Sequence, residues 1–181
     1  PRAPRDGWTV APDGSVAVVR AEPFHVEWIR PDGRVVRGPE VDYRPVDVGA
    51  PEKERYLDEL ASSGLSVGVT MENGVRSMQL QRGRSGGQGP TRAARIRELE
   101  WPETLPAFRE GGAIVAPDGR LWVRRFAAGG DPAAYDLFDR SGRRVGVVPL
   151  PTGRQVVGFA GDRVLAVHVD DLGLNWLETY R

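Results

Sequence analysis

One short block of sequence occurs twice, and this repeat constrains the fold more than any other feature. Val-Ala-Pro-Asp-Gly stands at residues 10–14 and again at residues 115–119. On both sides of each block, short runs of apolar residues alternate with polar ones. Asp-Gly between alternating runs is a strong signal for a tight β-hairpin turn, in which Asp hydrogen-bonds the backbone and Gly supplies a positive φ. We therefore expect a repeated unit of antiparallel strands.

Three copies of this unit are predicted. In residues 112–151 the strands are expected at Ala113–Ala116, Arg120–Arg125, Ala134–Arg140 and Arg143–Pro149. In residues 7–41 they are expected at Trp8–Ala11, Ser15–Arg20, Phe24–Arg30 and Arg34–Val41. In residues 154–181 only three are expected, at Val156–Ala160, Arg163–Val169 and Leu177–Arg181, so this copy lacks a fourth strand. Repeats of about 40 residues with four strands each are typical of β-propeller blades, and a blade needs a neighbour on each side to bury both faces.

The pattern resembles a known family. Ala-Pro-Asp-Gly is followed by Ser-Val-Ala-Val in one copy and by Arg-Leu-Trp-Val in the other, and the third strand ends at Pro-Asp-Gly-Arg or Arg-Ser-Gly-Arg. This order is similar to the blades of six-bladed β-propeller proteins of the NHL-like kind, and residues 118–123 match best. The resemblance implies an all-β fold, a partial β-propeller of about three four-stranded antiparallel blades, the last one incomplete, like the C-terminal portion of such a propeller. It implies the fold alone, because such propellers serve as enzymes, receptors and scaffolds.

Residues 42–111 interrupt the repeat and are expected to be an insertion in a single partial propeller domain. Several elements are predicted there: an amphipathic helix at Pro51–Ala61, a hairpin of Leu65–Thr70 with Ser77–Gln81, a flexible Gly-rich linker at residues 83–90, a weak helix at Thr91–Glu100 and extended chain at Trp101–Phe108. Pro in the first turn of the helix and Asn-Gly in the hairpin turn support the first two. The insertion either decorates one face or is the remains of a divergent blade, and we favour the decoration.

Composition excludes several classes of function. The formal net charge of zero argues against a general nucleic-acid binder, and the absence of cysteine excludes disulfides and thiolate sites. No apolar run approaches the ~20 residues that a membrane span needs. No export signal is visible, but the chain opens at Pro1, so a removed signal is compatible with the sequence. We expect a periplasmic or extracellular location.

Acidic residues recur at equivalent places in the third strands of the three copies: Glu27, Asp136 and Glu178. They either line a central channel and bind a cation or occupy solvent-facing positions of alternating strands, and we favour the second interpretation. His168 with Asp170 and Asp171 gives a metal-like pattern that is common by accident. His25 is expected to have a structural role. The sequence therefore predicts no catalytic residue, no cofactor and no metal site.

Two tryptophans and two arginines are the candidate partner contacts. Trp8, Trp28 and Trp122 fall in predicted strands and are expected in the core between blades. Trp101 and Trp176 lie outside these strands and are candidates for a contact surface, because aromatic residues are enriched at interface cores. Arg124 and Arg143 stand at strand ends, where they either contact an anionic partner or protect a strand edge.

These observations predict a non-catalytic binding or scaffolding β-propeller module. We expect an accessory subunit or extracytoplasmic domain that docks onto a larger protein assembly, which could be membrane-associated, with no transmembrane segment of its own. Because three blades do not close a ring, its partner is either another protein or the remaining blades of the propeller. The alternative is a metal-dependent propeller enzyme of the lactonase or lyase type, whose active site would be completed by missing blades.

Overall fold

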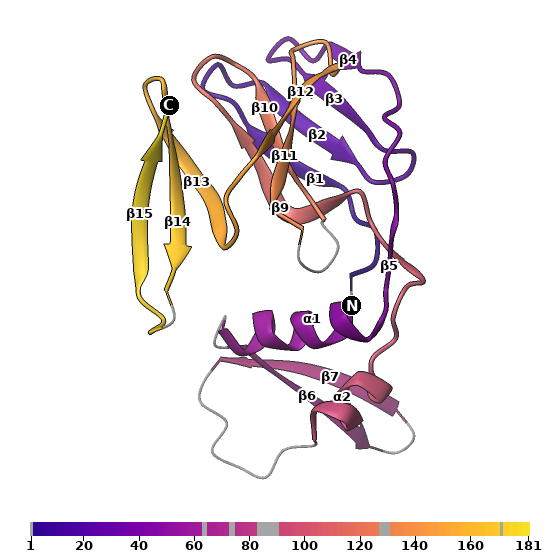
Figure 1. The fold of residues 1–181 in the computed structure, drawn as a ribbon. Helices are drawn as coiled ribbons and strands as arrows, with labels where there is room; N and C mark the ends of the chain where they lie inside the picture. The colour runs from indigo at the N-terminus through magenta and orange to yellow at the C-terminus, as the bar shows by residue number, and fades with distance from the viewer. Residues whose placement is uncertain (1, 63–64, 73–74, 83–90, 127–130, 171) are drawn as a thin grey trace. The chain divides into compact units, whose positions relative to one another are not determined.

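The computed structural model describes residues 2–62, 65–72, 75–82, 91–126, 131–170 and 172–181 (Figure 1). These residues form two compact units. One unit is residues 48–103, and the other joins residues 2–47 to residues 104–181. The predicted linker at residues 83–90 lies outside the described residues.

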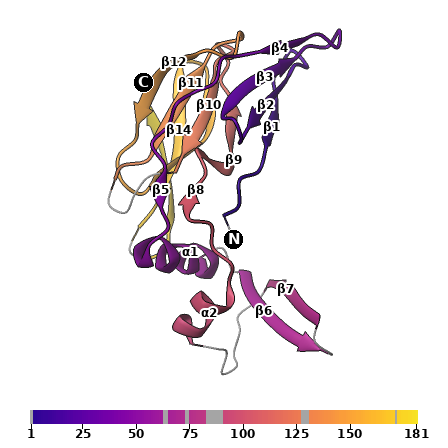
Figure 2. The same cartoon turned by 90° about the vertical axis from the view of Figure 1, so that its right-hand side faces the viewer.

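Three antiparallel sheets make up the larger unit, and each follows the chain order of its strands (Figures 1 and 2). The first sheet contains β1 (Gly7–Val10), β2 (Val16–Arg20), β3 (His25–Ile29) and β4 (Val35–Arg37). The second contains β9 (Phe108–Val115), β10 (Leu121–Arg125), β11 (Ala134–Phe138) and β12 (Arg144–Pro149). The third contains β13 (Arg154–Ala160), β14 (Arg163–Val169) and β15 (Asn175–Tyr180). The predicted antiparallel four-stranded sheets are therefore confirmed, although the described sheets do not close into a ring.

Local turn chemistry explains why these strands form hairpins. Five turn aspartates accept a hydrogen bond through Oδ1 from the backbone N–H two residues further on: Asp13, Asp32, Asp118, Asp139 and Asp170. The glycine at residues 14, 33, 119, 142 and 173 has a positive φ in each case. These contacts are the ones that the Asp-Gly and Ser-Gly turns predict, because the side-chain acceptor and the left-handed glycine reverse the chain within two or three residues.

The smaller unit contains the elements expected in the insertion. They are α1 (Ala50–Ser62), β6 (Leu65–Glu72), β7 (Val75–Arg82) and α2 (Arg92–Glu98). β6 and β7 pair as an antiparallel hairpin, and Thr91 caps α2 by accepting the N–H of Ala94. The chain leaves the larger unit at β5 (Val46–Asp47) and returns at β8 (Thr104–Leu105), and these two short strands pair with each other.

The first sheet packs one face against the second. Alternate side chains of β2 and β3 contact those of β10 and β11 in one core: Ala17, Val19, Val26, Trp28, Leu121, Val123 and Phe138. Trp28 also donates its Nε1–H to the carbonyl of Asp139 at 2.9 Å, and the Arg140 guanidinium lies 4.1 Å from the centre of the Trp28 ring. The turn that ends β11 therefore fastens the second sheet to the first.

The other face of the second sheet packs against the third. Its core contains Trp122, Tyr135, Leu137 and Val156, with Phe159 and Val164 at the margin. The Tyr135 hydroxyl accepts the backbone N–H of Val156 at 3.0 Å, and the rings of Trp122 and Phe159 meet edge to face. The two junctions thus stack three sheets in chain order, face on face.

Several strand bounds and one expected core residue differ from the sequence predictions: β4 ends at Arg37, β13 begins at Arg154, and β15 begins at Asn175 and so includes Trp176. β9 begins at Phe108 rather than at Ala113, because Phe108 pairs with Arg125 beyond a bulge in the strand register. Trp8 is 70% exposed, so its prediction as core was wrong, whereas Trp28 and Trp122 are buried as expected. Trp8 is in a strand, but it lies on the face of the first sheet that the second sheet does not cover.

Candidate functional site

The uncovered face of the first sheet carries a row of apolar side chains. Because residues on a strand alternate between faces, the neighbours of Ala17 and Val19 on β2 point away from the second sheet. With their register partners they form what we call the open face: Trp8, Val10, Val16, Val18, Ile29 and Val35. Val10 and Val35 are each 55% exposed. A contiguous exposed apolar surface of this kind marks an interaction site in a soluble protein.

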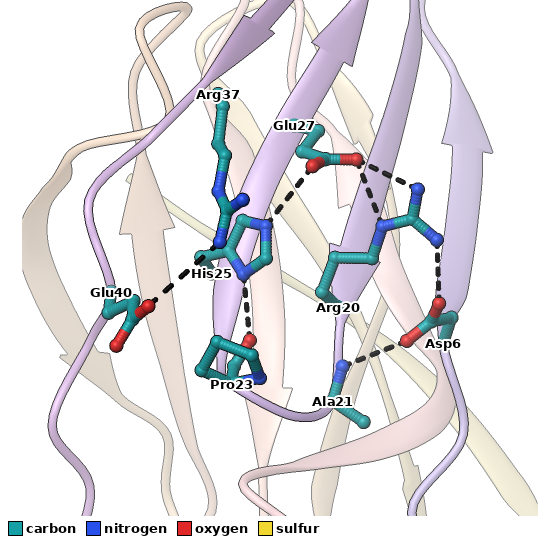
Figure 3. Close-up of polar contacts among 8 residues, drawn as sticks. All are labelled: Asp6, Arg20, Ala21, Pro23, His25, Glu27, Arg37 and Glu40. Atoms are coloured by element: carbon teal, nitrogen blue, oxygen red, sulfur yellow. Dashed lines mark hydrogen bonds and ion pairs between the residues drawn. The ribbon is translucent and has the colours of Figure 1, made fainter.

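A polar cluster borders the open face at the end of β2 (Figure 3). Arg20 donates from Nε to Glu27 Oε2 at 2.9 Å and from Nη1 to Asp6 Oδ2 at 2.7 Å. The second oxygen of Asp6 accepts the backbone N–H of Ala21 at 2.9 Å. The guanidinium therefore joins β2 to β3 and to the segment that leads into β1, which fixes this corner of the sheet.

His25 belongs to the same cluster and lies on the other side of Glu27 from Arg20 (Figure 3). Its Nδ1 lies 2.7 Å from the carbonyl oxygen of Pro23, and its Nε2 lies 3.2 Å from Glu27 Oε1. Both neighbours are acceptors, so a neutral ring donates to one of them and a protonated ring to both. The His25 side chain is buried, which agrees with the structural role expected from the sequence.

These contacts stabilise the charged forms of the two carboxylates. The hydrogen bond from His25 and then the Arg20 guanidinium lower the pKa of Glu27. The Arg20 guanidinium and the Ala21 N–H lower the pKa of Asp6. In return, the two carboxylates, Asp6 first, raise the pKa of Arg20. Asp6, Arg20 and Glu27 are therefore charged at neutral pH and pair with one another.

The second sheet repeats this arrangement in a buried setting. Asp136 is 1% exposed, and it accepts from Arg125 Nε at 2.7 Å and from Arg125 Nη2 at 2.5 Å. Arg144 Nη1 lies 3.6 Å from the same carboxylate. The prediction that this acid faces solvent was therefore wrong, because the first sheet covers the face on which Asp136 lies.

The third sheet repeats the arrangement once more. Arg154 donates from Nε and Nη2 to the two oxygens of Glu178, both at 3.1 Å, and the hydroxyl of Tyr180 donates to the same carboxylate. The Arg154 guanidinium, followed by the Tyr180 hydroxyl, lowers the pKa of Glu178 to about 2. His168 Nδ1 lies 3.9 Å from Glu178 Oε1.

Register shows that the three acids are equivalent. Each lies opposite an apolar residue of the second strand of its sheet, and the pairs are Glu27 with Val18, Asp136 with Val123, and Glu178 with Ala166. A basic residue follows that apolar residue two positions later on the same strand. It is Arg20 in the first sheet, Arg125 in the second and His168 in the third. Each acid thus has basic partners within its own sheet. Within the described ranges, His, Asp and Glu form no group of three or more that could hold a metal ion.

The same equivalence identifies what the open face lacks. In the second sheet the face that carries Val123 and Asp136 packs on the first sheet. In the third sheet the face that carries Val156 and Ala166 packs on the second. The corresponding face of the first sheet is the open face, which no other described sheet of the larger unit covers.

The four predicted contact residues are divided between the two units. Trp101 packs inside the smaller unit, where its Nε1–H donates to the carbonyl of Ile96 and its ring meets Tyr56 edge to face. Trp176 is 55% exposed at the edge of the third sheet, and its Nε1–H donates to Asp170. Arg124 donates to Gln155, whereas Arg143 lies exposed in the turn before β12.

No family model matches the chain, and no curated protein matches it. Among the described residues, neither helix is long and apolar enough to cross a bilayer. The function is therefore inferred from the sheets and their uncovered surfaces.

Proposed function

We propose that this chain is a non-catalytic binding or scaffolding module of the β-propeller type, and that the open face is its main contact surface. The observation that carries the proposal is the apolar row around Trp8, which remains exposed on a sheet whose opposite face is fully packed. Burying apolar area contributes about 25 cal/mol per Å², so a large exposed row strongly favours a partner.

The partner that fits this face is another four-stranded sheet of the same repeat, supplied by further propeller blades or by an associated protein. The junctions between the first and second sheets and between the second and third sheets are the model for this contact. In each junction the preceding sheet covers the face that is equivalent to the open face. In both, the covering sheet presents a large aromatic side chain, Trp28 in one and Trp122 in the other. We expect the cover of the open face to present a similar bulky aromatic residue.

The third sheet offers a second contact. In the first two sheets a fourth strand pairs with the third, but β15 has no such neighbour among the described strands. Leu177 on this strand is 64% exposed. An uncovered edge with apolar side chains is a template for an added strand. We therefore propose that an extended segment pairs with β15 in the assembled protein.

The enzymatic alternative has no observation in its favour among the described residues, since each acid of the row pairs with basic groups of its own sheet. Docking onto a larger, membrane-associated assembly outside the cytoplasm stays a prediction from the sequence.

Analytical ultracentrifugation of the isolated chain tests the proposed contact surface. We expect the wild-type chain to self-associate as its concentration rises, because the open face lacks its cover. Trp8→Glu places a charge on the most exposed side chain of that face and should shift the chain to a monomer. Val145→Glu is the matched control, because Val145 is a half-exposed apolar residue on β12, away from the open face. A wild-type chain that remains monomeric throughout, or equal effects of the two substitutions, would refute the proposal.

A further inference from the structure

A pocket of about 280 Å³ lies within the larger unit, away from the open face. Its walls come from four separate segments: the chain after β4, the chain before β9, the end of β10 and the start of β12. Binding pockets for small organic molecules measure about 300–1,000 Å³, so this one suits a compact ligand. No residue of the open face belongs to it.

Three arginines line this pocket: Arg44, Arg125 and Arg144. Arg125 is occupied by its paired hydrogen bonds to Asp136, whereas Arg144 approaches that carboxylate only to 3.6 Å. Arg44 is exposed and makes no hydrogen bond or ion pair with any described residue. Asp42 is the one acidic residue of the described lining, and Asp136 pairs with Arg125 and Arg144, so the three guanidinium groups exceed these two carboxylates by one charge. Arg44 and Arg144 therefore have N–H groups that can donate hydrogen bonds to an anion.

Apart from Asp42, the rest of the lining is mainly apolar, and other side chains contact its two aromatic rings. Phe126 lies beneath the Arg109 guanidinium, whose carbon is 5.1 Å from the centre of its ring. Tyr43 meets Phe24 edge to face with ring centres 6.0 Å apart, and Phe24 is itself buried in the core. The pocket thus combines flat apolar walls with an excess of guanidinium groups. That combination suits a ligand with one anionic group and one flat apolar part.

We propose that this pocket binds a small organic carboxylate with an aromatic or other flat apolar body. The carboxylate accepts hydrogen bonds from Arg44 and Arg144, and the apolar body lies against Phe126 and Tyr43. The planar guanidinium matches a carboxylate with two parallel hydrogen bonds, which a lysine could not provide. This inference goes beyond the scaffolding role and does not depend on it, because the two sites share no residue.

Titration of the chain with benzoate, followed by ligand-observed NMR, tests the proposal. We expect saturable binding with a dissociation constant on the order of 1 mM, which suits a ligand of this size. Arg44→Gln should weaken binding about tenfold, because a hydrogen bond to a charged group is lost. Arg34→Gln is the matched control: it removes the same charge from an exposed turn outside the pocket. Both arginines are exposed, so both variants should keep the thermal unfolding of the wild type.

Benzyl alcohol provides the second comparison, since it has the same ring without the charge. We expect it to bind at least about tenfold more weakly than benzoate, because it cannot form charge-assisted pairs with two arginines. Three results would each overturn the proposal: no saturable benzoate binding, equal loss of affinity in Arg34→Gln and Arg44→Gln, or equal binding of the alcohol and the acid.

Discussion

Two glycines meet where the first and second sheets join, and no larger residue fits at either place. A Cβ on Gly142 would lie 2.5 Å from the carbonyl oxygen of Val26, and Gly142 also has a φ of +74°. A Cβ on Gly38 would lie 2.2 Å from the Gly142 carbonyl oxygen. Both contacts are with backbone atoms, which cannot rotate away. The close approach of the sheets therefore depends on these two residues.

Gly142→Ala should destabilise the larger unit much more than Gly33→Ala. Gly33 has a similar φ of +82°, but nothing lies within 4 Å of an added Cβ, so alanine there adds only the backbone strain of about 1–3 kcal/mol. Gly142→Ala adds the backbone clash to the same strain. Urea unfolding of the two variants measures the difference. Equal losses would show that the sheets separate easily at this junction.

Asp136→Asn should lower the free energy of unfolding by about 3 kcal/mol, because removing one member of a buried ion pair leaves the other uncompensated. We expect the low end of the usual range, since Arg125 is one third exposed. Asp118→Asn is the control: Asp118 is an exposed turn residue whose backbone contact an amide oxygen can keep. A loss below about 1 kcal/mol in Asp136→Asn would mean that water replaces the carboxylate.

Glu178 should make stability depend on pH in a defined window. Its folded pKa is depressed to about 2 from an ordinary 4.5, so its contribution is fully present above pH 4.5 and is lost as the pH falls toward 2. Glu178→Gln removes this dependence. The difference in unfolding free energy between wild type and variant, measured from pH 6 to pH 2, should therefore shrink below about pH 4.5. A constant difference would show that the carboxylate charge does not contribute.

Among the elements, the hairpins depend on local chemistry, whereas each junction between sheets combines a packed core with a long-range hydrogen bond. The second and third sheets are joined by the buried hydrogen bond from the Val156 N–H to the Tyr135 hydroxyl. Burial raises the pKa of Tyr135, so the hydroxyl stays protonated at neutral pH. This contact ties the first residues of β13 to β11.

Tyr135→Phe should destabilise the third sheet by about 1–3 kcal/mol, because the Val156 N–H remains buried without an acceptor. In this variant, the amides of β13 and β14 should exchange faster than in the wild type, whereas the amides of β10 and β11 should change less. Tyr43→Phe serves as the control, since the Tyr43 hydroxyl makes no hydrogen bond with a described residue. Equal protection in both variants would contradict the proposed link between the sheets.

At the scale of the whole molecule, the smaller unit is inserted at a point where its two ends meet. Asp47 pairs with Thr104 across β5 and β8, and the Val48 N–H donates to the Glu103 carbonyl at 2.9 Å. Because β5 and β8 pair as antiparallel strands, a short turn could join them directly as a hairpin in place of residues 48–103.

Replacing residues 48–103 with an Asn-Gly turn should therefore leave the three sheets folded. Circular dichroism should retain the strand signal and lose the helical signal, and unfolding in urea should remain cooperative. The full chain is the reference. Loss of cooperative unfolding in the shortened chain would show that the sheets require the smaller unit.

The sequence alone determined the hairpins, because Asp-Gly turns and alternating strands act within a few residues of one another. It also determined that the sheets are antiparallel and that residues 42–111 break the repeat. Tertiary structure decided which face of each sheet is covered. Alternation of apolar and polar residues marks the two faces of a sheet but does not say which face meets a neighbour. For this reason the sequence did not show that Asp136 is buried, that its equivalent Glu27 borders the open face, or that Trp8 is exposed. The arginine pocket was equally hidden from the sequence, because packing gathers its walls from segments that lie far apart along the chain.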